Sequence, residues 1–320
     1  MRFKPLAILS RPLAAIGRLG APAVAASVFI GLALPDLAAL ARPLLLATIL
    51  ALLALSFLRT DLRGLTANRR GGLILVALLW VMGVLPAMFG YGISRIFPPQ
   101  DKGLMLALVM QAAAPPIMSA PAFALLLGLD ATLSLAVMVL SMLVTPLTAP
   151  LLVGAFTDGA LALDPLALAV RLAAVLVGTL CVGLGLRRLL GPARVSALRT
   201  PLDGINVVLL LILALALMDG VTARIAADPA LVAGLTALTF LVSLTALGLT
   251  MVLFRWVGEG QDLMLGFSAG HRNISLMIAA TGAVLPESTW LYVAVAQFPI
   301  YLLPVFLRPL ARRLHPPPPL

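Results

Sequence analysis

Runs of apolar residues long enough to cross a membrane follow one another along most of this chain of 320 residues, separated by short polar connectors. A helix needs about 20 apolar residues to cross the hydrocarbon core of a bilayer. The pattern predicts an all-α polytopic membrane protein with ten transmembrane helices, the first two short and separated by a turn at Pro35–Pro43. The expected spans are 21–36, 41–58, 71–97, 102–128, 131–157, 164–190, 202–219, 229–257, 260–284 and 287–310.

Composition and charge agree with this prediction and exclude a soluble protein. Hydrophobic residues make up 62% of the chain and charged residues 11%, whereas about a quarter of the residues in a soluble domain are charged. The net charge of +10 comes from cations in short connectors, so it indicates membrane topology and not a nucleic-acid partner. The single cysteine, Cys181, excludes a disulfide and a zinc site and is expected to be a buried structural thiol.

Lysine and arginine are distributed unequally between the two sides of the predicted bundle. With the N-terminus in the cytoplasm, the inner connectors and termini hold sixteen of them and the outer connectors four. The positive-inside rule therefore predicts that both termini are cytoplasmic. Residues 1–20 are predicted to be a basic amphipathic segment, because prolines and arginines interrupt the apolar core that a cleaved signal needs. Residues 311–320 are expected to form a short tail.

The spans divide into two halves of five, residues 21–157 and 164–310. Because five is odd, the second half enters the membrane from the opposite side, which predicts an inverted repeat. Spans 71–97 and 229–257 start 158 residues apart, and spans 131–157 and 287–310 start 156 apart. A similar offset matches "QAAAPPIMSAP" in the fourth span with "GFSAGHRN" in the ninth. Interrupted helices at matching positions are typical of the central site of a transporter.

The fourth span is interrupted by Pro115 and Pro116. Two successive prolines remove two backbone donors, and the carbonyls that they free must find partners away from lipid. Ser119 lies nearby and can donate to a carbonyl or to a ligand, and Met118 adjoins it. The alternative is a simple proline kink of the kind common in membrane helices.

The ninth span contains Gly270, His271, Arg272 and Asn273 in succession. Gly270 allows an unwound or closely packed backbone. An arginine within the membrane is costly and is a functional candidate by default, but it can also cap carbonyls freed at a break. His271 is a candidate proton relay, or a histidine that is merely hydrogen-bonded to backbone. Asn273 offers a donor and an acceptor that suit a carboxylate or a carbonyl cage.

No phosphate-binding GxxxxGK[ST] loop and no HExxH motif accompany these spans. We therefore expect neither ATP-driven transport, nor an enzyme, nor a cofactor. A reaction that used His271 as a base would lack a second catalytic group.

Three further features accompany the breaks elsewhere in the sequence: "LSLAVMVLSMLVTPLTAPLL" at Leu133–Leu152, "ARPLLL" between the first two spans, and Pro86 in the third. With the broken fourth and ninth spans, they make most of the chain resemble the bile acid:sodium symporter family, as a divergent bacterial-type member. The resemblance implies two inverted five-helix repeats, with broken helices 4 and 9 crossing, in a panel and a core domain. It also implies an inner-membrane location and an organic anion bound between the domains.

Several residues depart from the pattern of that family at the positions of its sodium ligands. The Ser-Asn pair of helix 4 appears as Ala120 and Pro121, and the acidic ligand of helix 9 appears as Ser268. One hydroxyl ligand of helix 5 is kept as Ser134 and the other is replaced by Met138. The glutamine of helix 9 is Arg272 and that of helix 3 aligns near Val81, whereas Gly270 and Asn273 are kept.

These departures lead to the hypothesis that Arg272 stands in for a sodium ion. The expected function is secondary transport of a small organic anion, a carboxylate or sulfonate, by alternating access without sodium. Alternatives are a sodium-coupled symporter with rearranged ion sites, proton coupling through His271, and a membrane sensor that binds without transporting. The expected partners are the anion, the lipid bilayer and a coupling ion. The predicted substrate-binding residues are Arg272, Asn273, His271, Ser268, Gly270, Ser119, Met118 and Gln297, and the ion-coupling candidates are Ser134, Ser268 and His271.

Overall fold

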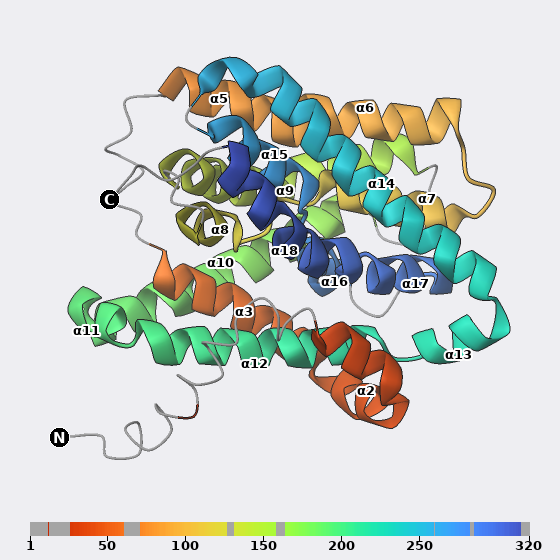
Figure 1. Cartoon of the computed structure of the whole chain (residues 1–320), viewed down its shortest axis with the longest axis horizontal. Helices are drawn as coiled ribbons and strands as arrows, with labels where there is room; N and C mark the ends of the chain where they lie inside the picture. The colour runs from red at the N-terminus through yellow and green to blue at the C-terminus, as the bar shows by residue number, and fades with distance from the viewer. Residues whose placement is uncertain are drawn as a thin grey trace. The chain divides into compact units, whose positions relative to one another are not determined.

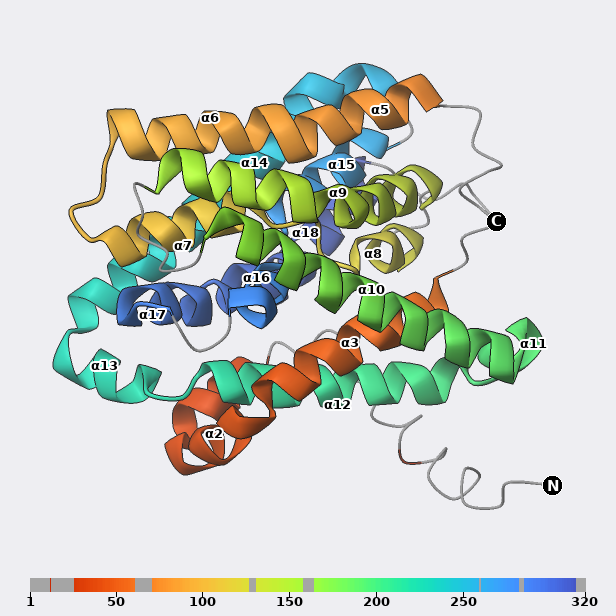
Figure 2. The ribbon, with the colours of Figure 1, turned by 180° about the vertical axis from the view of Figure 1, so that it is seen from behind.

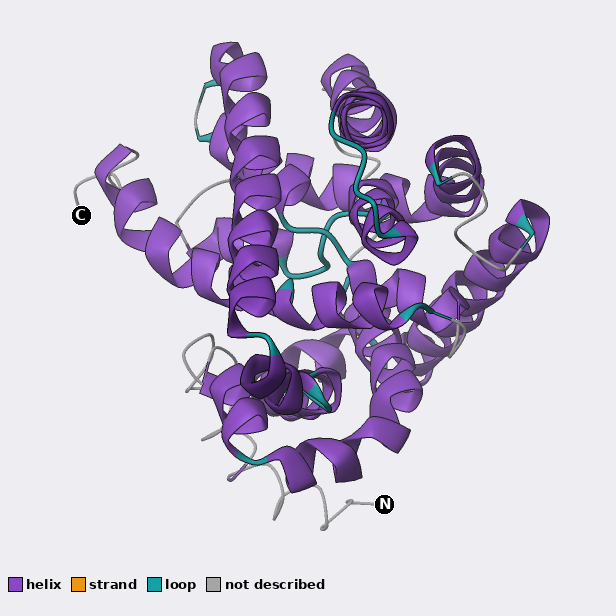
Figure 3. Ribbon diagram, turned by 90° about the vertical axis from the view of Figure 1, so that its right-hand side faces the viewer, coloured by secondary structure: helices purple, strands orange, loops and turns teal. Residues whose placement is uncertain are grey.

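The computed structural model describes residues 12, 26–60, 71–126, 131–157, 164–258, 260–281 and 285–314. These residues are almost entirely helical and contain no strand, which confirms the all-α prediction for this part of the chain (Figure 3). Except for Pro12, the predicted N-terminal segment 1–20 lies outside the described residues, as do residues 315–320. The last described helix continues to Leu314, so the predicted tail begins inside a helix.

Seven helices in the described residues are long and apolar enough to cross a membrane, which indicates an integral membrane protein. Three predicted spans are not among them. The fourth and ninth are each divided into two shorter helices, and in the described part of the first, 21–36, a helix covers only residues 26–33 before the interruption at Leu34. The ten-helix count and the inverted repeat stay predictions. The seven helices are Pro35–Arg59, Gly71–Ile96, Thr132–Phe156, Pro165–Leu190, Arg199–Ala227, Pro229–Val257 and Glu287–Leu307.

The chain forms two compact units, and each is built from two separate stretches of sequence. Unit 1 comprises Met1–Thr60 and Val175–Leu231, and unit 2 comprises Asp61–Ala174 and Val232–Leu320. Both units combine segments from the two predicted repeats, residues 21–157 and 164–310, so neither unit coincides with one repeat.

Unit 1 is organised around α12, which packs along α2 and α3. Arg59 forms an ion pair with Asp203, and Arg42 forms one of 3.8 Å with Asp219. Its helices are α2 (Pro35–Ala41), η1 (Arg42–Leu44), α3 (Leu45–Arg59), the second part of α10 (Pro165–Leu190), α11 (Pro192–Ala197), α12 (Arg199–Leu217) and α13 (Val221–Ala227).

Two predictions about unit 1 are wrong. The expected turn at Pro35–Pro43 is helical, and the interruption falls at Leu34, because a proline in the first turn of a helix lacks only a donor that would be unpaired anyway. The thiol of Cys181 is exposed, not buried. A residue in an apolar run of a membrane helix can lie on a face that no other part of the protein covers.

Unit 2 contains the two broken spans and the helices that surround them (Figures 1 and 2). The α7 helix packs against α9 and α17, and α15 packs against α8 and α9. The helices of unit 2 are, in chain order, α5 (Gly71–Leu79), the π-helix η2 (Trp80–Val84), α6 (Leu85–Tyr91), the π-helix η3 (Gly92–Ile96), α7 (Lys102–Ala113), α8 (Ala120–Leu126), α9 (Thr132–Phe156), the first part of α10 (Pro165–Leu190), α14 (Pro229–Phe254) from Val232 on, η4 (Arg255–Val257), α15 (Gln261–Gly270), α16 (Ile274–Thr281), α17 (Glu287–Val295) and α18 (Gln297–Leu314).

Candidate functional site

The two helix breaks lie against each other inside unit 2. Pro116 and Arg272 form an isolated antiparallel β-bridge. The Ile117 amide donates to the carbonyl of His271 at 2.8 Å, and the Asn273 amide donates to the carbonyl of Pro115 at 2.8 Å. Two segments more than 150 residues apart in sequence are therefore joined as extended chains between helix ends.

The bridge explains how an irregular backbone is tolerated within the membrane. Neither Pro115 nor Pro116 has a backbone donor, and the residues around them cannot complete a helix. Each break supplies one donor and one acceptor to the other, so buried backbone groups that helices would have paired are paired across the bridge. A simple proline kink would keep one helix continuous, whereas here α7 ends at Ala113 and α8 begins at Ala120.

Gly270 was predicted to be part of the break, but it is the last residue of helix α15, and the break begins at His271. The role of Gly270 is close packing against α14. A Cβ atom added to it would lie 2.6 Å from the carbonyl oxygen of Ser243, and one added to Gly266 would lie 2.8 Å from that of Leu247. Two glycines four residues apart thus let α15 approach the backbone of α14.

Residues Gly266–Gly270 also have the spacing G-x-S-x-G that occurs around the nucleophilic serine of α/β-hydrolases. That motif needs a sharp turn between a strand and a helix, so that the serine is exposed. Here Ser268 is fully buried inside α15, and its hydroxyl donates to the carbonyl of Met264 at 2.9 Å. The segment therefore has the spacing of the motif without the backbone turn that gives it its chemistry.

The guanidinium of Arg272 binds backbone carbonyls from three different segments. Nε donates to Ala269 at 2.8 Å, Nη1 donates to Ala114 at 3.0 Å, and Nη2 donates to Val81 at 2.9 Å. A fourth contact joins Nη1 to the sulfur of Met82 at 3.9 Å. The side chain thereby links the ends of α7 and α15 to the π-helix η2.

Arg272 is 4% exposed, and no carboxylate is among the partners that the described residues provide. Carbonyl oxygens converging on one centre of positive charge are also the ligands that a protein offers to an alkali or alkaline-earth cation. The guanidinium cannot lose its proton in a protein, so this positive charge is permanent.

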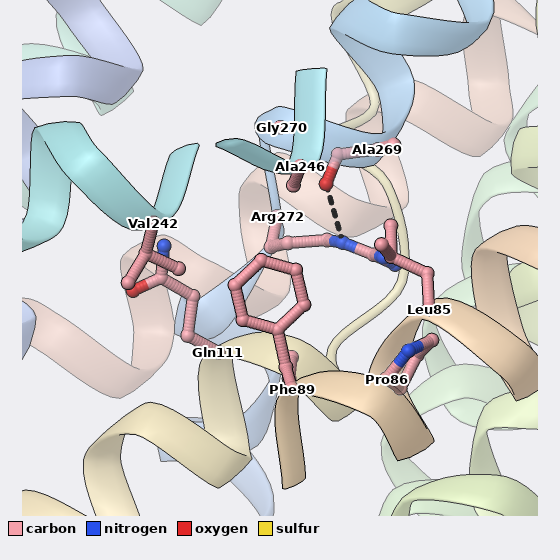
Figure 4. Close-up of a pocket in the computed structure, with 10 residues that line it drawn as sticks. Leu85, Pro86, Phe89, Gln111, Val242, Ala246, Ala269, Gly270 and Arg272 are labelled. Carbon is pink, nitrogen blue, oxygen red and sulfur yellow. Dashed lines mark hydrogen bonds between the residues drawn. The ribbon is translucent and has the colours of Figure 1, made fainter. Parts of the chain in front are cut away.

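A small pocket lies beside Arg272, with room for about one water molecule. Figure 4 shows the arginine side chain extended past the ring of Phe89, with Gln111 on the opposite side from Leu85. The pocket is lined by Leu85, Pro86, Phe89, Gln111, Ala112, Val242, Ala246, Ala269, Gly270 and Arg272. In this conformation it is too small for an organic anion.

Gln111 is a polar residue of this pocket that the sequence interpretation did not single out. Its side chain is 5% exposed, and its Oε1 accepts a hydrogen bond of 2.5 Å from the hydroxyl of Tyr292. Its Nε2 donates to the hydroxyl of Ser243 at 3.5 Å. The sequence feature that could have identified Gln111 was its side-chain amide in an otherwise apolar span, four residues before Pro115.

His271 is buried, and its ring lies against Phe267 of α15 and against the backbone of Pro299 in α18. Nδ1 lies 3.0 Å from the carbonyl of Phe267, and the imidazole stacks on the Phe267 ring at a centroid distance of 3.9 Å. Phe267 in turn stacks on Phe123 of α8 at 4.3 Å. This arrangement fits the reading of His271 as a histidine hydrogen-bonded to backbone.

Asn273 starts the second helix of the ninth span. Its side-chain oxygen accepts from the amide of Leu276 at 3.3 Å, as an N-cap residue does. Its backbone amide already belongs to the β-bridge, so Asn273 connects the break to helix α16.

Two of the predicted ion-coupling residues come together between α9 and α15. The hydroxyls of Ser134 and Ser268 are 3.3 Å apart, and both residues are fully buried. Among the described residues, no group of three or more His, Cys, Asp or Glu side chains could hold a metal ion.

The other predicted substrate-binding residues lie outside the Arg272 pocket. Ser119 is exposed at the turn before α8, and Met118 beside it is half-buried. Gln297 is buried at the start of α18 and donates to the carbonyl of Val293 at 3.1 Å. None of the three lines the pocket.

Comparison with known proteins adds no identification. No protein-family model matches the chain, and no curated protein matches it significantly.

Proposed function

We propose that this protein is a secondary transporter of a small organic anion, and that Arg272 takes the place of a bound sodium ion. The observation that carries the proposal is the binding of one buried guanidinium to the carbonyls of Ala269, Ala114 and Val81. These carbonyls come from two broken spans and a π-helix. Broken spans that meet in the membrane interior are the usual setting of transporter sites.

Independence from sodium follows from the residues around the break. A sodium site needs several oxygen ligands, and a carboxylate to offset the charge of the ion. Ser268 stands where the resemblance to the bile acid:sodium symporter family puts that carboxylate, and its hydroxyl is already bonded to Met264. Arg272 supplies a permanent positive charge to the same region, which favours an anionic substrate over a cation.

The division of the chain into two compact units supports the proposal of alternating access. We assign ten spans in two inverted repeats, with panel and core domains and both termini in the cytoplasm. The coupling mode is uniport, exchange or proton coupling through His271. The pocket beside Arg272 would have to widen in another conformation to admit part of an organic substrate.

Sodium-coupled symport is a second candidate, and the proximity of Ser134 and Ser268 favours it. Their hydroxyls are 3.3 Å apart at two positions that correspond to sodium ligands in the family that the chain resembles. With the carbonyl of Met264, they could supply oxygen ligands to a rearranged ion site.

Uptake into proteoliposomes tests the proposal against both alternatives. Labelled taurocholate and labelled pantoate, as representatives of sulfonates and carboxylates, are offered with an inward gradient of either sodium or potassium. The proposal predicts uptake above that of protein-free liposomes, equal for the two cations. Strong stimulation by sodium would support the symporter, and saturable binding without uptake would support a sensor.

A further inference from the structure

None of the described residues that bind the buried guanidinium of Arg272 carries a negative charge. Its partners are the carbonyls of Ala269, Ala114 and Val81 and the sulfur of Met82, all uncharged. None of the residues that line the adjoining pocket is Asp or Glu. A buried charge without a partner of opposite sign is strongly unfavourable, so an anion in this pocket would stabilise the protein.

The polar groups at the pocket still have donors to offer. A guanidinium has five N–H groups, and its four contacts leave one Nη2 hydrogen without an acceptor in the described part of the chain. The Gln111 oxygen accepts from Tyr292, which orients the amide so that Nε2 faces Ser243 and keeps a second hydrogen. An anion site needs a positive charge and hydrogen-bond donors that have no other acceptor, and both are present here.

The size of the pocket restricts which anion it can hold. It has room for about one water molecule. Its other walls are apolar and include Leu85, Pro86, Phe89 and Val242 (Figure 4). A halide is only slightly larger than water and carries one charge, whereas an organic anion of several carbon atoms does not fit.

We infer that this pocket binds a small monovalent anion of halide size, with Arg272 supplying the charge and Gln111 a hydrogen bond. The anion would offset the buried guanidinium and would stabilise the crossing of the two broken spans. The site shares Arg272 and its pocket with the proposed organic-anion site, but the inference does not rest on transport, because binding can be measured on protein that transports nothing.

Thermal unfolding of the purified protein in detergent tests the inference. Unfolding is followed in potassium chloride, potassium formate and potassium gluconate at equal ionic strength and pH. Chloride is expected to raise Tm over gluconate by about 2–4 °C and to saturate, because a ligand that binds only the folded state stabilises it by mass action. Equal Tm values in chloride and gluconate would overturn the inference. A response to formate but not to chloride would also overturn it, and would identify the pocket as a subsite for a carboxylate group.

Matched variants locate the effect while leaving Arg272 in place. Ala246→Val adds two methyl groups to the pocket wall on α14, and Ala237→Val makes the same change at an exposed position of that helix. We expect Ala246→Val to lose the chloride response and Ala237→Val to keep it. Ala112→Val fills the pocket from α7 and replaces Ala246→Val if that variant does not fold. A full chloride response in a folded pocket-filling variant would contradict the assignment.

Discussion

The Nη1 atom of Arg272 donates a hydrogen bond of 3.0 Å to the carbonyl of Ala114, a residue 158 positions earlier at the end of α7. This bond joins the two broken spans through a side chain, beside the backbone bridge of Pro116 and Arg272. The same guanidinium also donates hydrogen bonds to the backbone carbonyls of Ala269 and Val81. One side chain therefore binds carbonyls at the ends of α7 and α15, where the two spans are interrupted, and a carbonyl of the π-helix η2.

Replacing Arg272 with glutamine is expected to destabilise the protein strongly. Glutamine is too short to reach all three carbonyls, and each buried polar group left unsatisfied costs about 1–3 kcal/mol. We expect a total loss on the order of 3–5 kcal/mol, and a smaller one for Arg272→Lys, which keeps the charge but not the planar arrangement of donors. Thermal unfolding in detergent measures both. If Arg272→Gln were as stable as the wild type and bound anions equally well, the guanidinium would neither stabilise the helix breaks nor bind the anion.

Gly270→Ala is expected to destabilise the contact between α14 and α15. The added methyl group would lie 2.6 Å from the carbonyl oxygen of Ser243, which is too close unless a helix moves. Gly248→Ala on α14 is the matched control, because nothing lies within 4 Å of its added Cβ. An alanine in a helix is favoured over glycine by about 0.5–1 kcal/mol, so the control should raise Tm while Gly270→Ala lowers it. Equal shifts in the two variants would show that the close approach does not constrain the helices.

Tyr292→Phe is expected to weaken the link between α7 and α17. It removes the donor to Gln111 Oε1, whose hydrogen bond is 2.5 Å long, and leaves a buried amide oxygen without that partner. The expected loss is about 1–3 kcal/mol. Tyr301→Phe is the control, because the Tyr301 hydroxyl makes no hydrogen bond in the described part of the chain. Equal unfolding midpoints for Tyr292→Phe and Tyr301→Phe would contradict the structural role of this hydrogen bond.

The sequence predicted the coarse architecture and the two breaks, because hydropathy and proline act locally. Apolar runs of about 20 residues favour membrane helices, and two successive prolines in the middle of a span interrupt its helix. The position of the first interruption was mispredicted, because proline is tolerated in the first turn of a helix, and Pro35 begins α2.

The details of the site depend on contacts between distant segments and could not be predicted in the same way. The partners of Arg272 are backbone carbonyls, which carry no signal in the sequence. The role of Gly270 depends on how closely α14 approaches, and the importance of Gln111 depends on Tyr292 and Ser243. Ser134 and Ser268 were predicted separately as ion-coupling candidates, and the sequence did not predict that their hydroxyls lie 3.3 Å apart.

The proximity of Ser134 and Ser268 can be tested by cross-linking. With Cys181 replaced by serine, cysteines at positions 134 and 268 should form a disulfide between α9 and α15 on mild oxidation. Labelling of the denatured protein with a maleimide then measures the remaining thiols. We expect the double-cysteine protein to lose its labelling and each single-cysteine protein to keep it. Full labelling of the oxidised double variant would mean that the two side chains do not meet.

The central claim is that Arg272 replaces a sodium ion, and equilibrium binding of radioactive sodium to the purified protein tests it most directly. The assay compares wild-type protein with protein-free detergent and needs no knowledge of the transported substrate. The account predicts no saturable sodium binding to the wild type, because the guanidinium already supplies a positive charge where the two breaks meet. Saturable binding of sodium that potassium does not displace would contradict it.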